Sequence, residues 1–210
     1  MKIDSHQFDF ALTTYCQAKC RSCARTNIKT GETEDWLELR HMSLDVFRRT
    51  LDAPRDIDIS YIEFCGEFGD PMMHPRVDSF IEAALEYAPY VLISTNGGLR
   101  NSSWYEKIAR KYKDSLAIIF AIDGATHDVN WLYREGVDFQ KAFDNMKAYH
   151  GAGGHTEWAF LLFEWNWHQI PLAREMAAEI GMTVEFRYND RDFGLISPES
   201  RIKAERLLNE

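Results

Sequence analysis

Apolar residues along the chain alternate between two kinds of segment. Short runs rich in β-branched and aromatic residues are each followed by a turn and then by a stretch with helical spacing of its apolar positions. The expected strands cover residues 8–14, 59–64, 90–94, 116–122, 157–163 and 183–188. The expected helices begin near residue 43 and then cover residues 75–87, 104–112, 139–149, 170–180 and 198–208. The pattern therefore predicts six strand–helix units in strict alternation.

Strict alternation of strand and helix predicts one parallel sheet with right-handed crossover connections. Six units are too few to close an eight-stranded barrel, so the expected α/β fold is a partial (β/α)6 TIM-like barrel or a doubly wound sheet. In both arrangements functional residues gather in the loops that follow the strands. We expect a single domain over residues 1–210, with a core at about 8–188 and a C-terminal helical tail at 189–210.

The charge balance narrows the choice of partners. The formal net charge of −9 argues against DNA and against an anionic membrane, because both bind basic surfaces. The sequence has no apolar run of membrane-spanning length, and its first residues lack the layout of a signal peptide. We therefore expect a cytoplasmic protein.

Three of the four cysteines fall within eight residues, directly after the first expected strand. Cys16, Cys20 and Cys23 have the spacing C-x3-C-x2-C. Three thiolates on a short loop can ligate three irons of a cubane cluster and leave the fourth iron open to a small molecule. The alternative is zinc, which requires four ligands in a structural site, and His41 is a weak fourth candidate. The spacing favours the cluster over zinc.

The cysteine motif, placed after the first strand and preceded by an aromatic residue, resembles that of the radical S-adenosylmethionine (SAM) superfamily. The resemblance implies that Cys16, Cys20 and Cys23 hold one [4Fe–4S] cluster whose fourth iron chelates SAM. It also implies that one electron, from a donor such as flavodoxin or ferredoxin, cleaves SAM to methionine and a 5′-deoxyadenosyl radical. That radical takes a hydrogen atom from the substrate.

Loops after the second and third strands resemble further motifs of this superfamily. Gly66 and Glu67 match the Gly-Gly-Glu motif, and the resemblance implies that they position the SAM amino group. Cys65 stands where the family has its first glycine. Thr95 and Asn96, in Ser-Thr-Asn-Gly-Gly, match the Thr-Asn-Gly turn beside the SAM ribose and methionyl group. Each match is weak alone, and its weight comes from its place in the order of motifs.

Later loops add three candidate SAM contacts. Asp123 lies in Ala-Ile-Asp-Gly, which resembles the family's Ser-x-Asp-Gly, with alanine in place of the serine. Arg134 matches an arginine that often follows and could pair with the SAM carboxylate, although a surface ion pair is an equal alternative. Trp165, in the loop after the fifth strand, is a candidate neighbour of the adenine, with a core or lid tryptophan as the alternative.

No catalytic side chain can be assigned from the sequence, but two residues are weak candidates for redox chemistry. These are Cys65 and Tyr61, which lie on or next to the second strand. Cys65 is expected to fill a small space, and a role as a fourth cluster ligand is the alternative. Among the scattered histidines, His74 is the one expected to face the site, where it could donate a proton.

The substrate is the least determined part of the hypothesis. No cysteine follows Cys65, so we expect no auxiliary-cluster domain. The order of the motifs resembles the branch that matures ribosomally made peptides, including spliceases. This resemblance implies a peptide or protein substrate and, for some members, a small leader-recognition partner protein. One alternative is a small-molecule radical SAM enzyme, such as those that build deazapurine nucleosides. Another is a non-catalytic zinc or iron–sulfur binding protein.

Overall fold

The computed structural model describes residues 6–53, 57–190 and 193–210. Within them the chain forms one sheet of six parallel strands in the order β1-β2-β3-β4-β5-β6. The strands are β1 (His6–Phe10), β2 (Ile59–Phe64), β3 (Val91–Thr95), β4 (Leu116–Ala121), β5 (His155–Leu162) and β6 (Val184–Tyr188). Because each strand pairs with its predecessor, the right-handed crossovers all lie on one face, which is the arrangement of an open partial barrel. The predicted α/β fold class is confirmed.

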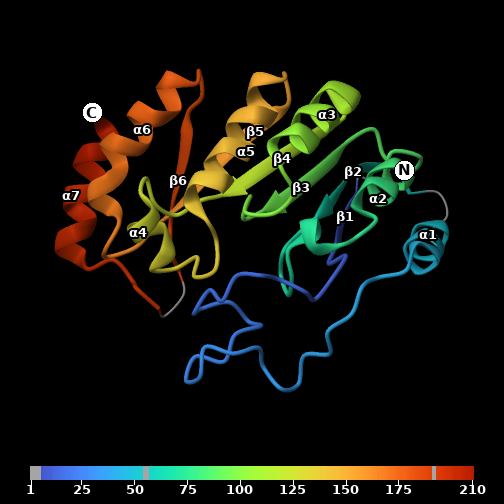
Figure 1. Cartoon of the computed structure of the whole chain (residues 1–210), viewed down its shortest axis with the longest axis horizontal. Helices are drawn as coiled ribbons and strands as arrows, with labels where there is room; N and C mark the ends of the chain where they lie inside the picture. Colours follow the sequence, from blue (N-terminus) through green and yellow to red (C-terminus); the bar gives the residue numbers. More distant parts are fainter. Residues whose placement is uncertain (1–5, 54–56, 191–192) are drawn as a thin grey trace.

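Helices separate the strands (Figure 1). The α-helices are α1 (Leu44–Asp52), α2 (Val77–Ala84), α3 (Ser102–Tyr112), α4 (His127–Trp131), α5 (Phe139–Gly151), α6 (Ile170–Glu179) and α7 (Pro198–Asn209). Two short 3₁₀ helices are η1 (Pro71–Met73) and η2 (Trp167–Gln169). Polar N-caps start several of them, as Ser43 does for α1 by accepting a hydrogen bond from the backbone N–H of Val46 at 3.2 Å. The helices of the described residues are all too short or too polar to cross a lipid bilayer.

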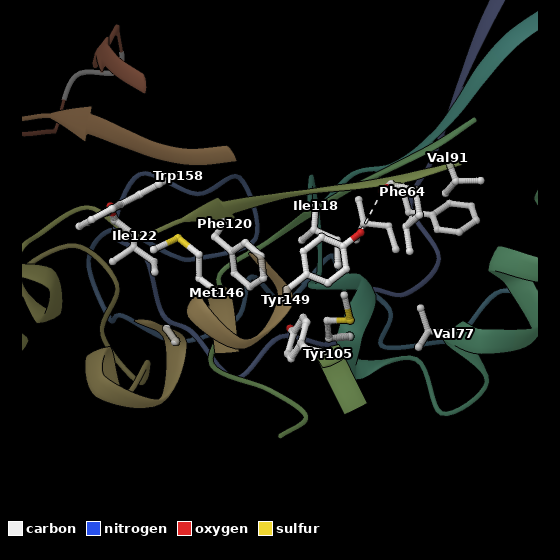
Figure 2. Close-up of a cluster of buried hydrophobic side chains, with 14 of the residues drawn as sticks. Phe64, Val77, Val91, Tyr105, Ile118, Phe120, Ile122, Met146, Tyr149 and Trp158 are labelled. Atoms are coloured by element: carbon white, nitrogen blue, oxygen red, sulfur yellow. Dashed lines mark hydrogen bonds between the residues drawn. The ribbon is translucent and has the colours of Figure 1, made fainter. Parts of the chain in front are cut away.

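One face of the sheet is sealed by the helices. Alternate strand residues, such as Phe64 on β2 and Phe120 on β4, are fully buried. Phe64 meets Phe80 of α2 at 6.5 Å between ring centroids, and Phe120 meets Tyr105 of α3 at 5.4 Å. Figure 2 shows this cluster, in which the buried hydroxyl of Tyr149 donates to the carbonyl of Leu116 at 2.9 Å. Each such buried aliphatic or aromatic side chain contributes about 1.5–3 kcal/mol to folding.

The other face of the sheet is more open. Successive side chains of a strand point to opposite faces of the sheet. Those that point to this face, such as Glu63, Ile119 and Leu161, are only half-buried. Ser94 on β3 donates to Oε1 of Glu63 on the neighbouring strand β2 at 3.0 Å. This face and the loops at the carboxyl ends of the strands are therefore the part of the fold that remains available for a ligand.

The first expected strand and several helix bounds differ from the sequence-based prediction. β1 ends at Phe10 rather than residue 14, because Thr13 instead forms an isolated antiparallel bridge with His41. The expected helix 75–87 is shorter and covers Val77–Ala84, and the 3₁₀ helix η1 precedes it. Helix α4 was not predicted. In the expected tail 189–210 the structure shows α7, whereas residues 191–192 lie outside the described residues.

Candidate functional site

The three predicted cysteine ligands border a single cavity of about 490 Å³. They lie in segment 11–43 between β1 and α1, which runs past the carboxyl ends of the strands and is blue in Figure 1. Cys20 is buried, while Cys16 and Cys23 are half-buried. The backbone N–H of Cys23 donates to the carbonyl of Cys20 at 3.0 Å, which folds the second half of the motif into a tight turn. The structure thus places all three cysteines at the lining of one cavity.

The loops after β2 and β3 and the segment that follows β4 also line this cavity. The predicted cofactor contacts that line the cavity are Gly66, Glu67, Thr95, Asn96 and Arg134. Side chains at the ends of three strands, Ser94, Ala121 and Leu161, also line it. These residues come from distant parts of the sequence and meet because parallel strands end at the same edge. The cavity therefore combines the cysteine motif with three of the other predicted motifs.

Asn96 connects the turn after β3 to the cysteine loop. Its Nδ2 lies 3.8 Å from Cys16 Sγ, and its Oδ1 accepts a hydrogen bond from Gln17 Nε2 at 2.7 Å. The same Oδ1 accepts from the backbone N–H of Gly98 at 2.9 Å. Between them Gly97 has φ +74°, a left-handed conformation that favours glycine. The Thr-Asn-Gly turn is thus fixed in shape and directed at the cysteine loop.

Two predicted contacts, Asp123 and Trp165, lie outside the lining of the cavity in the described residues. Asp123 is fully buried behind Arg134, whose Nε donates to Asp123 Oδ2 at 2.6 Å. Trp165 stacks on Phe163 with 4.7 Å between ring centroids and an interplanar angle of 7°. Contact of either residue with a cofactor stays a prediction, and both have protein partners already.

Asp70 is a carboxylate of the site that we did not identify from the sequence. It lines the cavity and is 4% exposed. Its oxygens accept from the Thr95 hydroxyl at 2.9 and 3.0 Å, from the Asn96 N–H at 2.8 Å and from the Met72 N–H at 2.9 Å. Burial raises the pKa of this carboxyl. The signal was present, because Gly69-Asp70 repeats the Gly-acid pair of Gly66-Glu67 three residues later.

Gly69 lies in close contact with the backbone of the cysteine segment. A Cβ at this position would lie 2.2 Å from the carbonyl oxygen of Thr13 and 2.6 Å from that of Tyr15. The next N–H, that of Asp70, donates to the carbonyl of Tyr15 at 3.0 Å. Glycine is therefore needed where the loop after β2 meets the start of the cysteine motif.

Arg25 is a second residue that sequence reasoning missed. It is 5% exposed, and its guanidinium donates to three backbone carbonyls: Phe68 at 3.0 Å, Ala18 at 3.2 Å and Thr14 at 3.3 Å. It thereby joins the two ends of the cysteine loop to the loop after β2. Backbone carbonyls have no sequence signature, so nothing in the sequence distinguished this arginine from a surface residue.

Comparison with protein families decides the class of the chain. A family model described as the radical SAM superfamily matches residues 10–177, which include all three cysteines and the whole cavity lining. The chain belongs to the radical SAM superfamily. This superfamily uses a [4Fe–4S] cluster and SAM as its cofactors. No curated protein matches the chain in sequence.

Solved structures with the same fold include several radical SAM enzymes. SuiB of Streptococcus suis bound to its precursor peptide SuiA matches with a TM-score of 0.76 and 14% identity, over 98% of this chain and 45% of SuiB. The anSMEcpe protein with bound AdoMet matches with a TM-score of 0.71 and 16% identity, over 97% of this chain and 59% of anSMEcpe. Methylornithine synthase PylB matches with a TM-score of 0.63 and 14% identity, over 97% of this chain and 62% of PylB. The chain thus spans roughly half the length of these proteins, and the likeness establishes the partial-barrel fold.

The donor set of the cavity fits a radical SAM cluster. The Cys16 sulfur accepts from the backbone N–H of Ala18 at 3.4 Å and from Asn96 Nδ2 at 3.8 Å. The Cys20 sulfur lies 3.8 Å from Arg134 Nη1. Such donors to sulfur stabilise thiolate ligands. Among the described residues, no three His, Cys, Asp or Glu side chains are close enough together to hold a single metal ion. Burial raises the pKa of Cys16 to about 12, so binding of iron must displace a proton from this thiol.

Among the described residues, neither Cys65 nor Tyr61 belongs to the lining of the cavity. Cys65 is half-buried, and the described residues that line the cavity do not include it. Burial raises the pKa of its thiol, and the nearby carboxylates of Glu63 and Asp9 also raise it. The Tyr61 hydroxyl donates to Gln7 Oε1 on the neighbouring strand. Any redox role of these two residues stays a prediction.

His74 does not face the cavity, contrary to our expectation. It is 2% exposed, its Nε2 lies 3.0 Å from the carbonyl of Met42, and its Nδ1 accepts from the backbone N–H of Arg76 at 3.1 Å. Both ring nitrogens are therefore used by backbone groups, which requires the neutral tautomer with hydrogen on Nε2. Burial lowers the pKa of His74, and the charges of Arg76 and Arg100 add to this effect.

The lowered pKa of His74 predicts a dependence of stability on pH. Because the native state binds this proton less tightly than the unfolded chain, the free energy of unfolding should fall as the pH drops below about 6.5. Urea unfolding at about pH 7.5 and about pH 5.5 measures the slope, which His74→Gln should reduce. The exposed His127→Gln is the control and should leave the slope unchanged. An equal slope in both variants would assign the pH dependence to other groups.

Proposed function

We propose that this chain is a radical SAM enzyme that modifies a peptide or protein by abstracting a hydrogen atom. The observation that carries the proposal is the meeting of Cys16, Cys20 and Cys23 with the loops after β2 and β3 around one cavity. When bound there, the cluster supplies the electron that cleaves SAM to methionine and a 5′-deoxyadenosyl radical. The three thiols would hold the cluster, and Asn96 would orient Cys16.

Several cavity residues are suited to hold SAM. Gly66 has no side chain and leaves room for close approach of the polar groups of SAM, and Glu67 offers an exposed carboxylate for the amino group. Asn96 lines the same cavity. We add Asp70 to this set, because it also lines the cavity. The proposed set also includes Thr95, Arg134, Asp123 and Trp165. Asp123 would act through Arg134, to which it is hydrogen-bonded.

The peptide substrate is supported by two features. SuiB is seen with a precursor peptide and anSMEcpe with peptides, and both share this fold. Next to the cavity-lining Tyr133 and Arg134, the side chains of Trp131 and Leu132 are 42% and 50% exposed, which suits an extended apolar partner. We further propose a cytoplasmic location, a single catalytic domain, a flavodoxin- or ferredoxin-type electron donor and a small leader-recognition partner.

The proposed reaction predicts formation of 5′-deoxyadenosine. The protein is reconstituted anaerobically with iron and sulfide, supplied with SAM and dithionite, and the product is measured by mass spectrometry. A triple variant, Cys16→Ala, Cys20→Ala and Cys23→Ala, is the control and should form none. Zinc in place of iron in the native protein, or equal product from the triple variant, would contradict the assignment.

The substrate class is tested with labelled peptide. A short peptide encoded beside the gene is synthesised with deuterium at its side chains and backbone, and added to the reconstituted enzyme. Transfer of deuterium into 5′-deoxyadenosine is expected if the peptide is the substrate. If the amount of 5′-deoxyadenosine does not change with this peptide but rises when a small nucleoside is added, the small-molecule alternative is favoured.

A further inference from the structure

A buried ion pair connects the end of β4 to one cysteine of the triad. Arg134 Nε donates to Asp123 Oδ2 at 2.6 Å, and the two side chains are 17% and 0% exposed. On its other side the same guanidinium places Nη1 3.8 Å from Cys20 Sγ. Asp123 is itself fixed, because its Oδ1 accepts from the backbone N–H of Leu161 at 2.7 Å. The positive charge is thereby held in one place against the sulfur.

Cys20 differs in this respect from the other two cysteines. Within the described part of the chain, the donors to the Cys16 sulfur are neutral, namely the amide of Asn96 and the N–H of Ala18. Cys23 lies against a backbone carbonyl, that of Glu67. The other buried arginine of the site, Arg25, directs its guanidinium at backbone carbonyls. Arg134 is thus the one charged donor among the hydrogen bonds made to the three sulfurs in the described residues.

A fixed charge at a ligand sulfur changes the energy of adding an electron. A thiolate-held cluster becomes more negative on reduction, and its potential depends on net charge, on hydrogen bonds to sulfur and on solvent exposure. Inside a protein the effective dielectric constant is far below that of water, so a nearby guanidinium favours the reduced state. The Asp123 carboxylate has the opposite sign and opposes this effect.

We propose that Arg134 is a positioning residue that raises the reduction potential of the cluster through Cys20, and that Asp123 limits the increase. This inference rests on the proposed function, because it requires the cysteines to hold a cluster. It does not require SAM, since the contacts between Arg134, Asp123 and Cys20 are present in the protein alone. The effect can therefore be separated from any contact that Arg134 makes with the SAM carboxylate.

The midpoint potential of the reconstituted cluster, measured without SAM by a redox titration followed by electron paramagnetic resonance, tests this role. Arg134→Gln is expected to lower the potential and Asp123→Asn to raise it. Each shift should be at least tenfold in the one-electron equilibrium constant, or about 59 mV. Arg134→Lys keeps the charge and should stay nearer the native value. Arg110→Gln, which removes an exposed arginine of α3, is the control.

Shifts of opposite sign in the potentials of Arg134→Gln and Asp123→Asn indicate a charge effect. A general loosening of the site would shift both potentials in the same direction. Equal potentials in all proteins, or shifts of one sign in Arg134→Gln and Asp123→Asn, would overturn the inference. If Arg134→Gln does not retain its cluster, the midpoint potentials of Asp123→Asn and Arg134→Lys are compared instead. An Asp123→Asn protein whose potential is no higher than that of the native protein would then contradict the inference. A native protein that binds no cluster would instead contradict the proposed function.

Discussion

Replacing Cys20 by alanine is expected to leave a folded chain that no longer binds an iron–sulfur cluster and forms no detectable 5′-deoxyadenosine. Cys20 lies deepest of the three cysteines, at 6% exposure, and its neighbour Arg134 provides no replacement sulfur. With two thiolates left, the cubane would lack a protein ligand on two of its irons. The side chain itself is small, so its loss should cost the fold only about 1 kcal/mol.

Iron and sulfide content, together with the absorbance of the reconstituted protein, measures cluster loss directly. Circular dichroism shows that the fold persists. Cys65→Ala is the matched control, because Cys65 is the fourth cysteine and lies outside the lining of the cavity. It should retain iron and sulfide at the native level. Loss of the cluster in Cys65→Ala would contradict the assignment of three ligands, and full iron content in Cys20→Ala would contradict the role of Cys20.

Much of the fold was predictable because it depends on local patterns. The alternation of apolar runs with helical stretches predicts strands such as 59–64 and 116–122, and parallel pairing then places the loops after them at one edge. The cysteine spacing and the Thr95-Asn96 turn were recognisable for the same reason, since each is contained in a few consecutive residues. The structure brings these predicted residues to one cavity.

The remaining parts of the site depend on contacts between segments far apart in sequence. Asp123 was expected as a SAM contact, but only the fold shows that its carboxylate oxygens are shared between Arg134 and the N–H of Leu161. His74 was expected to face the site, but its ring is used by the backbone of Met42 and Arg76. Periodicity and spacing carry no information on such partners, because backbone groups are the same at every position.

Replacing Arg25 by alanine is expected to lower the free energy of unfolding by about 3 kcal/mol and to reduce cluster retention. The change leaves the carbonyls of Thr14, Ala18 and Phe68 without their charged donor in a buried setting. Hydrogen bonds from charged donors are worth more than neutral ones, and an orphaned buried acceptor bears its full desolvation cost. Urea unfolding measures the stability, and the rate of iron loss to a chelator measures retention.

The geometry of the guanidinium, and not its charge alone, should account for the effect of Arg25. Its donors reach carbonyls on the cysteine loop and on the loop after β2 at the same time, which a single ammonium cannot reproduce. Arg25→Lys is therefore expected to recover only part of the lost stability and to release iron faster than the native protein. Arg40→Ala, which removes a side chain that is 72% exposed, should change the unfolding free energy by no more than about 0.5 kcal/mol. A native-like Arg25→Lys protein would show instead that a positive charge suffices to join the two loops.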